Sequence, residues 1–305
     1  MRRLARAVAA SAALSLGALT AGCSGPASAD GPLVVVTTNI LGDVVERLVG
    51  GQAEVMTLMA PDADPHSFEI SAREAARLLD ADLIVSNGLG LEEGLQQHVD
   101  AAAAEGVEVV AAGDLIETLA YTEGDAEGEV DPHFWTDPQR MIDVVDGLEP
   151  RLAIDGVDPS ALASSVAAYR GELEALDAEM TASFAAIPEE RRALVTNHHV
   201  FGYLADRFGF RVIGAVLPSG TTLAAPSASD LEELTSAIEE AGVPTIFADS
   251  SQPDRLVQVL ADEADLDVDV VALFTESLTA PDGGAPTYLE MMRSNERLLS
   301  TGLSP

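Results

Sequence analysis

Three histidine positions and one glutamate follow predicted β-strands, at the points where these strands end: His66, His133, His198–His199 and Glu276. In open parallel sheets, ligands bind just beyond the carboxyl ends of the strands. Neutral imidazoles with one carboxylate are the usual ligand set for zinc and an acceptable one for manganese. Four protein ligands would leave no open coordination position for an activated water molecule, which favours carrying an ion over catalysis. The fifth histidine, His98, lies among polar residues of a predicted helix and is expected at the surface.

The turn Asp131–Pro138 holds His133 together with the only tryptophan, Trp135. Asp137 is a good helix N-cap, the proline after it suits a first helical position, and apolar residues follow at helical spacing up to Leu148. We therefore expect His133 on a rigid turn at the start of a helix. Trp135 is expected either to line the site or to lie in the core.

The first half of the chain alternates short apolar strands with amphipathic helices. The strands are continuous apolar runs, which is typical of parallel strands covered on both faces. Predicted strands are Leu33–Thr38, Glu54–Met59, Leu83–Ser86 and Val107–Ala111. Predicted helices are Leu41–Val49, Ala72–Leu79, Leu91–Ala104 and Pro138–Leu148.

A long uninterrupted helix is predicted from Asp158 to Ile187, with one apolar stripe at steps of three and four residues. At 1.5 Å per residue it would be roughly 40 Å long, enough to contact two lobes. The alternative is a coiled-coil dimer. It is disfavoured because this is one isolated helical segment inside a globular chain.

The second half repeats the pattern of the first. Predicted strands are Ala193–Thr196, Arg211–Val216, Thr245–Ala248 and Val268–Phe274. Predicted helices are Val200–Phe208, Asp230–Ala241, Pro253–Ala264 and Thr287–Leu299. Ser229 with Glu232 is the expected capping box of the second of these helices, and Gly242 is expected to end it. The predicted fold is therefore α/β, with two lobes that each hold a mainly parallel sheet flanked by helices, joined by one long rigid linker helix.

The start of the chain is typical of a bacterial lipoprotein. Arginines precede an apolar run, and small residues stand directly before Cys23, the only cysteine. We expect a signal peptide at 1–22, a lipidated Cys23 and a tether at 23–31. The remaining predicted segments are an N-terminal lobe at 32–157, a linker helix at 158–188 and a C-terminal lobe at 189–305.

The formal net charge of −35 disfavours contact with nucleic acid or anionic lipid. Membrane contact is therefore expected through the lipid anchor only. The loop 122–130 is acidic and lacks histidine, and the simplest interpretation is a solvated loop.

Several motifs occur in a telling order along the chain: Pro65–Glu69, Gly88–Glu92, Asp131–Pro138, His198–Tyr203, Glu276–Leu278 and Tyr288–Asn295. This combination resembles the zinc- and manganese-binding lipoproteins of bacterial ABC importers, the cluster A-I solute-binding proteins. The resemblance covers nearly the whole mature chain. It implies two α/β lobes joined by one long helix, with a metal ion held in the cleft between them.

The resemblance also implies the ligands. By position in the motifs, His66, His133 and His198 bind the metal; the family spacing His-x-x-Phe before Gly-Tyr selects His198 over its neighbour. The fourth family ligand is an aspartate, and Glu276 stands in its place here. Asp249 or a water molecule is the alternative fourth ligand. Residues expected to support the ligands are Asp131, Asp137, His199 and Asp249.

The resulting hypothesis is an extracytoplasmic, lipid-anchored, monomeric receptor that is not an enzyme. It would capture Zn²⁺ in the cleft and deliver it to an ABC permease with its ATPase; a metallochaperone is a further candidate partner. The same role for Mn²⁺ is the first alternative. A secreted zinc hydrolase is disfavoured, since neither H-E-x-x-H nor G-x-S-x-G occurs. A metal-stabilised adhesin would unfold without metal.

Overall fold

The structure is a computed structural model that describes residues 31–122, 126–217, 220–223, 226–251, 257–258, 261 and 268–304. The predicted signal peptide, Cys23, nearly all of the tether and most of the predicted helix Pro253–Ala264 lie outside these residues. No helix in the described ranges combines the length and apolar character needed to cross a bilayer.

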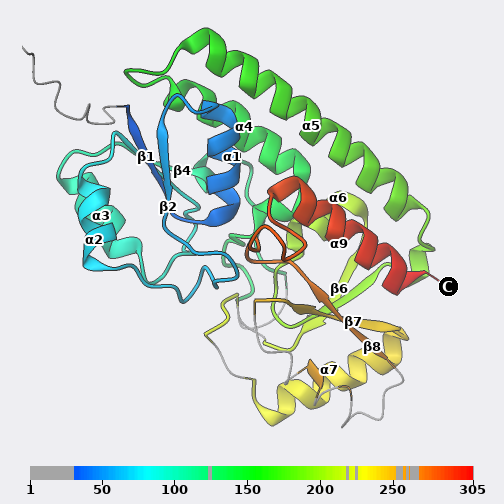
Figure 1. Ribbon diagram of the computed structural model, residues 1–305. Coiled ribbons are helices and arrows are strands. Elements are labelled where there is room, and N and C mark those ends of the chain that lie inside the picture. Colours follow the sequence, from blue (N-terminus) through cyan, green and yellow to red (C-terminus); the bar gives the residue numbers. More distant parts are fainter. Residues whose placement is uncertain are drawn as a thin grey trace, which may run out of the picture. The chain divides into compact units, whose positions relative to one another are not determined.

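Two four-stranded sheets form the centre of the described chain (Figure 1), and every ladder between their strands is parallel. The first sheet has the order β2-β1-β3-β4, and the second repeats it as β6-β5-β7-β8. Their strands are β1 (Leu33–Val36), β2 (Glu54–Thr57), β3 (Leu83–Ser86), β4 (Val109–Ala111), β5 (Ala193–Thr196), β6 (Arg211–Ala215), β7 (Thr245–Asp249) and β8 (Asp269–Leu273). The predicted fold class is confirmed, and every predicted strand is present within two residues of its expected ends.

Helices cover both faces of the first sheet. One face, with Val34 and Val36, packs in a cluster with α1 and α4, while the other, with Val35 and Ile84, packs with α2 and α3. These helices are α1 (Asn39–Val49), α2 (Ala72–Leu79), α3 (Gln96–Ala104) and α4 (Pro138–Leu152), with short 3-10 turns η1 (Ala112–Leu115) and η2 (Phe134–Thr136). Since both faces are buried, the strands need apolar residues at every position, and this explains the continuous runs in the sequence.

One predicted helix begins later than expected. The segment from Leu91 was predicted to be helical, but α3 starts only at Gln96. The physical reason is Glu92, whose buried carboxylate accepts hydrogen bonds from the Thr37 hydroxyl and from the backbone N–H groups of Asn87 and Gly88. These bonds hold the segment in a turn that an uninterrupted helix could not form.

The second sheet is covered in the same way by α6 (Gly202–Phe208), α7 (Ala228–Ala241) and α9 (Tyr288–Leu303). Gly242 ends α7 in a left-handed conformation, as predicted. The predicted capping box was wrong by two residues. Ser227 and Asp230 cap each other, so Ser229 lies inside the helix.

The long helix α5 (Pro159–Ala185) stands between the two sheets in the chain and lies within two residues of its predicted ends. Asp158 is its N-cap, and η3 (Glu189–Arg191) leads from it into β5. It packs against α1 and α4 of the first sheet and against α6 and α9 of the second (Figure 1). Its apolar stripe, including Leu173 and Phe184, is fully buried in the largest hydrophobic cluster, which also holds residues of both sheets. One continuous core therefore joins the two halves.

Candidate metal centre

Four buried side chains meet beyond the carboxyl ends of the strands: His66, His133, His198 and Glu276. Each offers one donor atom, and all four donors lie within 4.8 Å of one another. His66 follows β2, His133 follows β4, His198 follows β5 and Glu276 follows β8. Among the described residues, this is the group that could hold a metal ion.

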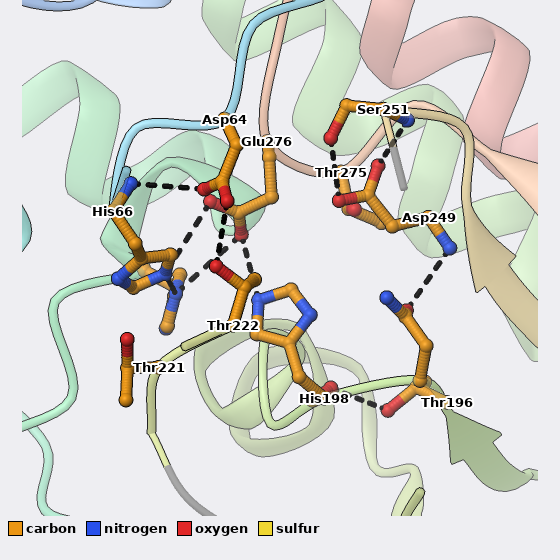
Figure 2. A network of polar contacts seen from close by, with 12 residues as sticks. Asp64, His66, Thr196, His198, Thr221, Thr222, Asp249, Ser251, Thr275 and Glu276 are labelled. Carbon is orange, nitrogen blue, oxygen red and sulfur yellow. Dashed lines mark hydrogen bonds and ion pairs between the residues drawn. The ribbon is translucent and has the colours of Figure 1, made fainter. Parts of the chain in front are cut away.

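His66 belongs to a tight turn that Asp64 organises. The Asp64 carboxylate accepts hydrogen bonds from the His66 backbone N–H at 2.9 Å and from the Ser67 hydroxyl at 2.9 Å. Figure 2 shows Asp64 and His66 beside Glu276. The imidazole is only 2% exposed.

His133 sits on the turn before α4, where Asp137 caps the helix by accepting from the Gln139 N–H. Its ring Nδ1 lies 2.8 Å from Asp131 Oδ1, and the same carboxylate oxygen accepts from the His133 backbone N–H. When the ring proton is on Nδ1, the Nδ1–H group donates a hydrogen bond to Asp131, and Nε2 keeps its lone pair for a metal ion. Trp135 is buried with its ring edge-on to His133 at 5.2 Å, and its indole N–H donates to the Thr275 carbonyl. It therefore both lines the site and belongs to the core.

His198 lies two residues beyond β5 and is fully buried. The Thr196 hydroxyl donates to the His198 carbonyl and fixes the backbone there. The His198 Nε2 lies 3.0 Å from Glu276 Oε1. His199 is outside the four-residue group, and its ring lies 6.1 Å from that of Tyr121.

Glu276 enters from the loop after β8. Asn39 of α1 holds that loop, since it donates to the Ser277 hydroxyl oxygen and accepts from the Leu278 N–H. The second carboxylate oxygen, Oε2, is buried without a hydrogen bond, and it lies 3.7 Å from His66 Nε2. A buried oxygen without a hydrogen bond is costly, so Oε2 is suited to bind a cation.

Two other predicted supporting residues have local roles. Asp249 accepts hydrogen bonds from the Ser251 N–H and hydroxyl, as Figure 2 shows, and it is not in the four-residue group. Asp137 caps α4 and pairs with Arg207 at 3.6 Å.

The electrostatics of the site suit a cation. Burial lowers the pKa of His66 to about 4 and that of His133 to about 3, and it lowers the pKa of His198 too. The imidazoles are therefore neutral at pH 7, as metal ligands must be. Burial raises the pKa of Glu276, a rise that His133 and His66 oppose, and it raises the pKa of Asp131 to about 7. The charged partners that would favour the ionised form of either carboxylate are imidazoles, which are neutral at pH 7.

The donor spacing fits tetrahedral coordination. With zinc–nitrogen bonds of roughly 2.0–2.1 Å, two ligands of a tetrahedral ion lie about 3.3 Å apart. The Nε2 atoms of His66 and His133 are 3.3 Å apart. Glu276 Oε1 lies 3.4 Å from His133 Nε2 and 3.0 Å from His198 Nε2. These three donor–donor distances match those of a tetrahedral ion, and all four donors lie within 4.8 Å of one another.

The sequence analysis assigned no contact role to several residues around the site. Tyr121 places its hydroxyl 3.2 Å from His133 Nδ1. Tyr203 of α6 donates to the Asp131 carbonyl, and Asn87 donates to the Pro132 carbonyl. Tyr203 and Asn87 hold the turn that carries His133. A tyrosine in a loop and one within an apolar helix face carry no periodicity that indicates such a contact.

Comparisons with known proteins agree with this architecture. Residues 34–302 match the family model described as "ZnuA: Zinc-uptake complex component A periplasmic". The chain is 33% identical over 293 residues to the zinc-binding protein TroA of Treponema pallidum, covering 92% of this chain and 94% of that protein. It is 26% identical over 276 residues to the manganese-binding lipoprotein MntA of Halalkalibacterium halodurans, with 90% and 89% covered.

A solved structure of the periplasmic zinc-binding protein TroA from Treponema pallidum superposes with a TM-score of 0.82 at 29% identity. The superposition covers 90% of this chain and all of that one. The matches confirm the resemblance that the motifs predicted. The chain therefore belongs to the ZnuA family of periplasmic components of metal-uptake complexes.

Proposed function

We propose that this chain is the extracytoplasmic receptor of an ABC importer and that it captures Zn²⁺ with His66, His133, His198 and Glu276. The observation that carries this proposal is the meeting of three neutral imidazoles and one carboxylate with tetrahedral spacing. Such a donor set favours zinc. The zinc-binding relative TroA supports the same assignment.

The site is saturated by protein donors, and this supports a carrier and not an enzyme. A catalytic zinc site keeps one position open for water or substrate. Here the four side chains surround one point and are at most 2% exposed. We propose that the ion is cargo, which the receptor gives up to a permease and its ATPase, and that the chain acts as a monomer anchored through Cys23.

The same carrier role for Mn²⁺ is the second candidate, and Glu276 is the observation that favours it. Its unpaired Oε2 could bind beside Oε1 and raise the number of oxygen ligands, which manganese prefers. The manganese-binding relative MntA is in line with this alternative.

We also propose that lobes at 32–157 and 189–305, with the linker helix 158–188, are the functional units. Both supply ligands, since His66 and His133 come from the first and His198 and Glu276 from the second. The ion would therefore bind between them.

The test is a competitive titration of the metal-stripped protein with Zn²⁺ and Mn²⁺ against a chelator of known affinity. We expect one equivalent of Zn²⁺ per chain and a protein that stays folded after stripping, as a carrier requires. Unfolding on metal removal would indicate a structural ion instead.

His133→Ala tests the ligand assignment, with His98→Ala as the matched control. His133 is fully buried in the site, whereas His98 lies on α3 outside the metal-binding group. We expect His133→Ala to lower affinity by about 100-fold or more and His98→Ala to leave it unchanged. Normal binding by His133→Ala would refute the assignment.

A further inference from the structure

A short segment after β6, Gly220–Leu223, contacts the first half of the chain at two points beside the site; we call it the strap. The Thr222 hydroxyl donates to Asp64 Oδ2 at 2.6 Å. The Tyr121 hydroxyl donates to the Gly220 carbonyl at 3.4 Å. Strap residues are 158 and 99 positions away from these partners in the chain.

The first contact reaches His66 through Asp64. The carboxylate that accepts from Thr222 also accepts from the His66 backbone N–H and from the Ser67 hydroxyl. Figure 2 shows Thr222, Asp64 and His66 as neighbours around Glu276. Holding this carboxylate therefore holds the turn that aims the His66 ring.

The second contact reaches His133 through Tyr121. The same phenol oxygen that donates to Gly220 lies 3.2 Å from His133 Nδ1. Gly220 makes this approach possible, because a Cβ there would lie 2.7 to 2.9 Å from three Tyr121 side-chain atoms. Any larger residue would push the strap away from Tyr121.

The strap contacts are less buried than the ligands. The four donors are at most 2% exposed, whereas the bond between Thr222 and Asp64 is only partly buried and Leu223 is 59% exposed. A partly buried contact outside the core can break without disturbing the core.

We propose that Thr222 is a positioning residue for metal retention: by holding Asp64 it keeps His66 on the ion, and its separation from Asp64 permits metal release. This inference rests on the proposed function, since it concerns release from the same site. The strap would control the rate of metal release, while the four ligands determine which metal binds and how tightly.

The test measures Zn²⁺ release from the loaded full chain into an excess of a coloured chelator by stopped flow. A hydrogen bond to a charged group contributes enough that its loss in Thr222→Val should speed release by about tenfold. Thr222→Ser keeps the hydroxyl and should release at the wild-type rate. Thr235→Val is the matched control, since the Thr235 hydroxyl bonds only within its own helix, to Leu231.

A double-mutant cycle separates positioning from a general loss of structure. In the Asp64→Ala background, Thr222→Val should add no further acceleration, because its partner is gone. Gly220→Ala should also speed release, and metal-free Thr222→Val should remain folded.

Unchanged release from Thr222→Val, or an equal acceleration in the Asp64→Ala background, would overturn the inference while leaving the proposed function intact. If the wild-type protein retained no Zn²⁺, the proposed function would fall and the inference with it.

Discussion

Replacing Glu276 by glutamine should move metal affinity and metal-free stability in opposite directions. Glutamine has nearly the same shape but carries no charge. The Glu276 carboxylate is buried, burial raises its pKa, and Oε2 lacks a hydrogen bond. An amide removes the buried charge and can donate to the neighbouring imidazole Nε2 atoms, the nearest at 3.0 Å in His198.

The magnitudes follow from this geometry. Four-ligand zinc sites bind with roughly 10–16 kcal/mol, so one ligand contributes about 2.5–4 kcal/mol, or about 100- to 1000-fold in Kd. An amide oxygen still coordinates weakly, so we expect the lower end, about 100-fold. Relief of the unpaired buried group should add about 1–3 kcal/mol to the metal-free protein. For a chain of this size that is a rise in Tm of about 2–5 °C.

Calorimetry of Glu276→Gln and wild type, each with and without Zn²⁺ at pH 8, measures both effects. Glu105→Gln is the control, since Glu105 is exposed at the end of α3. At pH 4 the stability gain should shrink, because a carboxyl with a raised pKa is then protonated in the wild type as well. If metal-free Glu276→Gln had a lower Tm than the wild type at pH 8, or if its Kd for Zn²⁺ were unchanged, Glu276 would not be a buried carboxylate that a cation stabilises.

Two further predictions follow from the core and from the titrating groups. Leu173→Ala should lower the free energy of unfolding by about 2–5 kcal/mol, because Leu173 is fully buried in α5. Ser164→Ala, on the exposed side of α5, should change it by less than about 0.5 kcal/mol. Denaturant unfolding measures both values. Burial raises the pKa of Asp131 from 3.8 to about 7, so this group contributes stability to the metal-free protein that is present below pH 3.8 and lost as the pH rises through about 7. Metal binding favours the ionised Asp131, so Zn²⁺ should displace a proton from Asp131 at pH 6 and no proton from it at pH 8. Titration calorimetry in two buffers measures this proton release. Equal proton release at both pH values would contradict the role of Asp131 beside His133.

The sequence was sufficient to predict the strands and the four side chains that meet beyond them, because both follow from local patterns. Apolar runs of four or five residues mark buried parallel strands, and polar residues directly after them must lie at one edge of a sheet. His198 and Glu276 stand two and three residues past their strands, so little chain intervenes. His133 follows its strand by more than twenty residues, and its position depended on the motif around it.

Choosing between carboxylates required three dimensions. Asp249 is the last residue of β7 and is as close to a strand end as any ligand. Its oxygens are engaged by Ser251, whereas Glu276 points one oxygen at His198 and leaves the other unpaired. Distance from a strand end does not distinguish the two carboxylates. The motif favoured Glu276, and the hydrogen bonds of Asp249 agree with that choice.

The helix ends show the same limit on a smaller scale. Two serine–acid pairs at the same spacing overlap before α7, and only the backbone conformation at Ser227 makes it the cap. The later start of α3 comes from Glu92, whose partner Thr37 is 55 residues away. The contacts of the strap join residues that are distant in the chain. The sequence of a loop without periodicity does not predict such contacts.

The charges around the ion explain why a divalent cation suits this site. The three imidazoles are neutral, and four carboxyl groups act on the donors: Glu276 itself, Asp131 at 2.8 Å from His133, Asp64 beside His66, and Asp249 near His198. When ionised, these groups carry enough negative charge to balance a divalent ion. Burial raises the pKa of Glu276 and that of Asp131, because a charged carboxylate is costly away from water, and a bound cation opposes this rise. A monovalent cation would leave more of the buried charge unbalanced than a divalent one. The carboxylates therefore bias the site toward +2 ions, and the imidazoles bias it toward zinc among them.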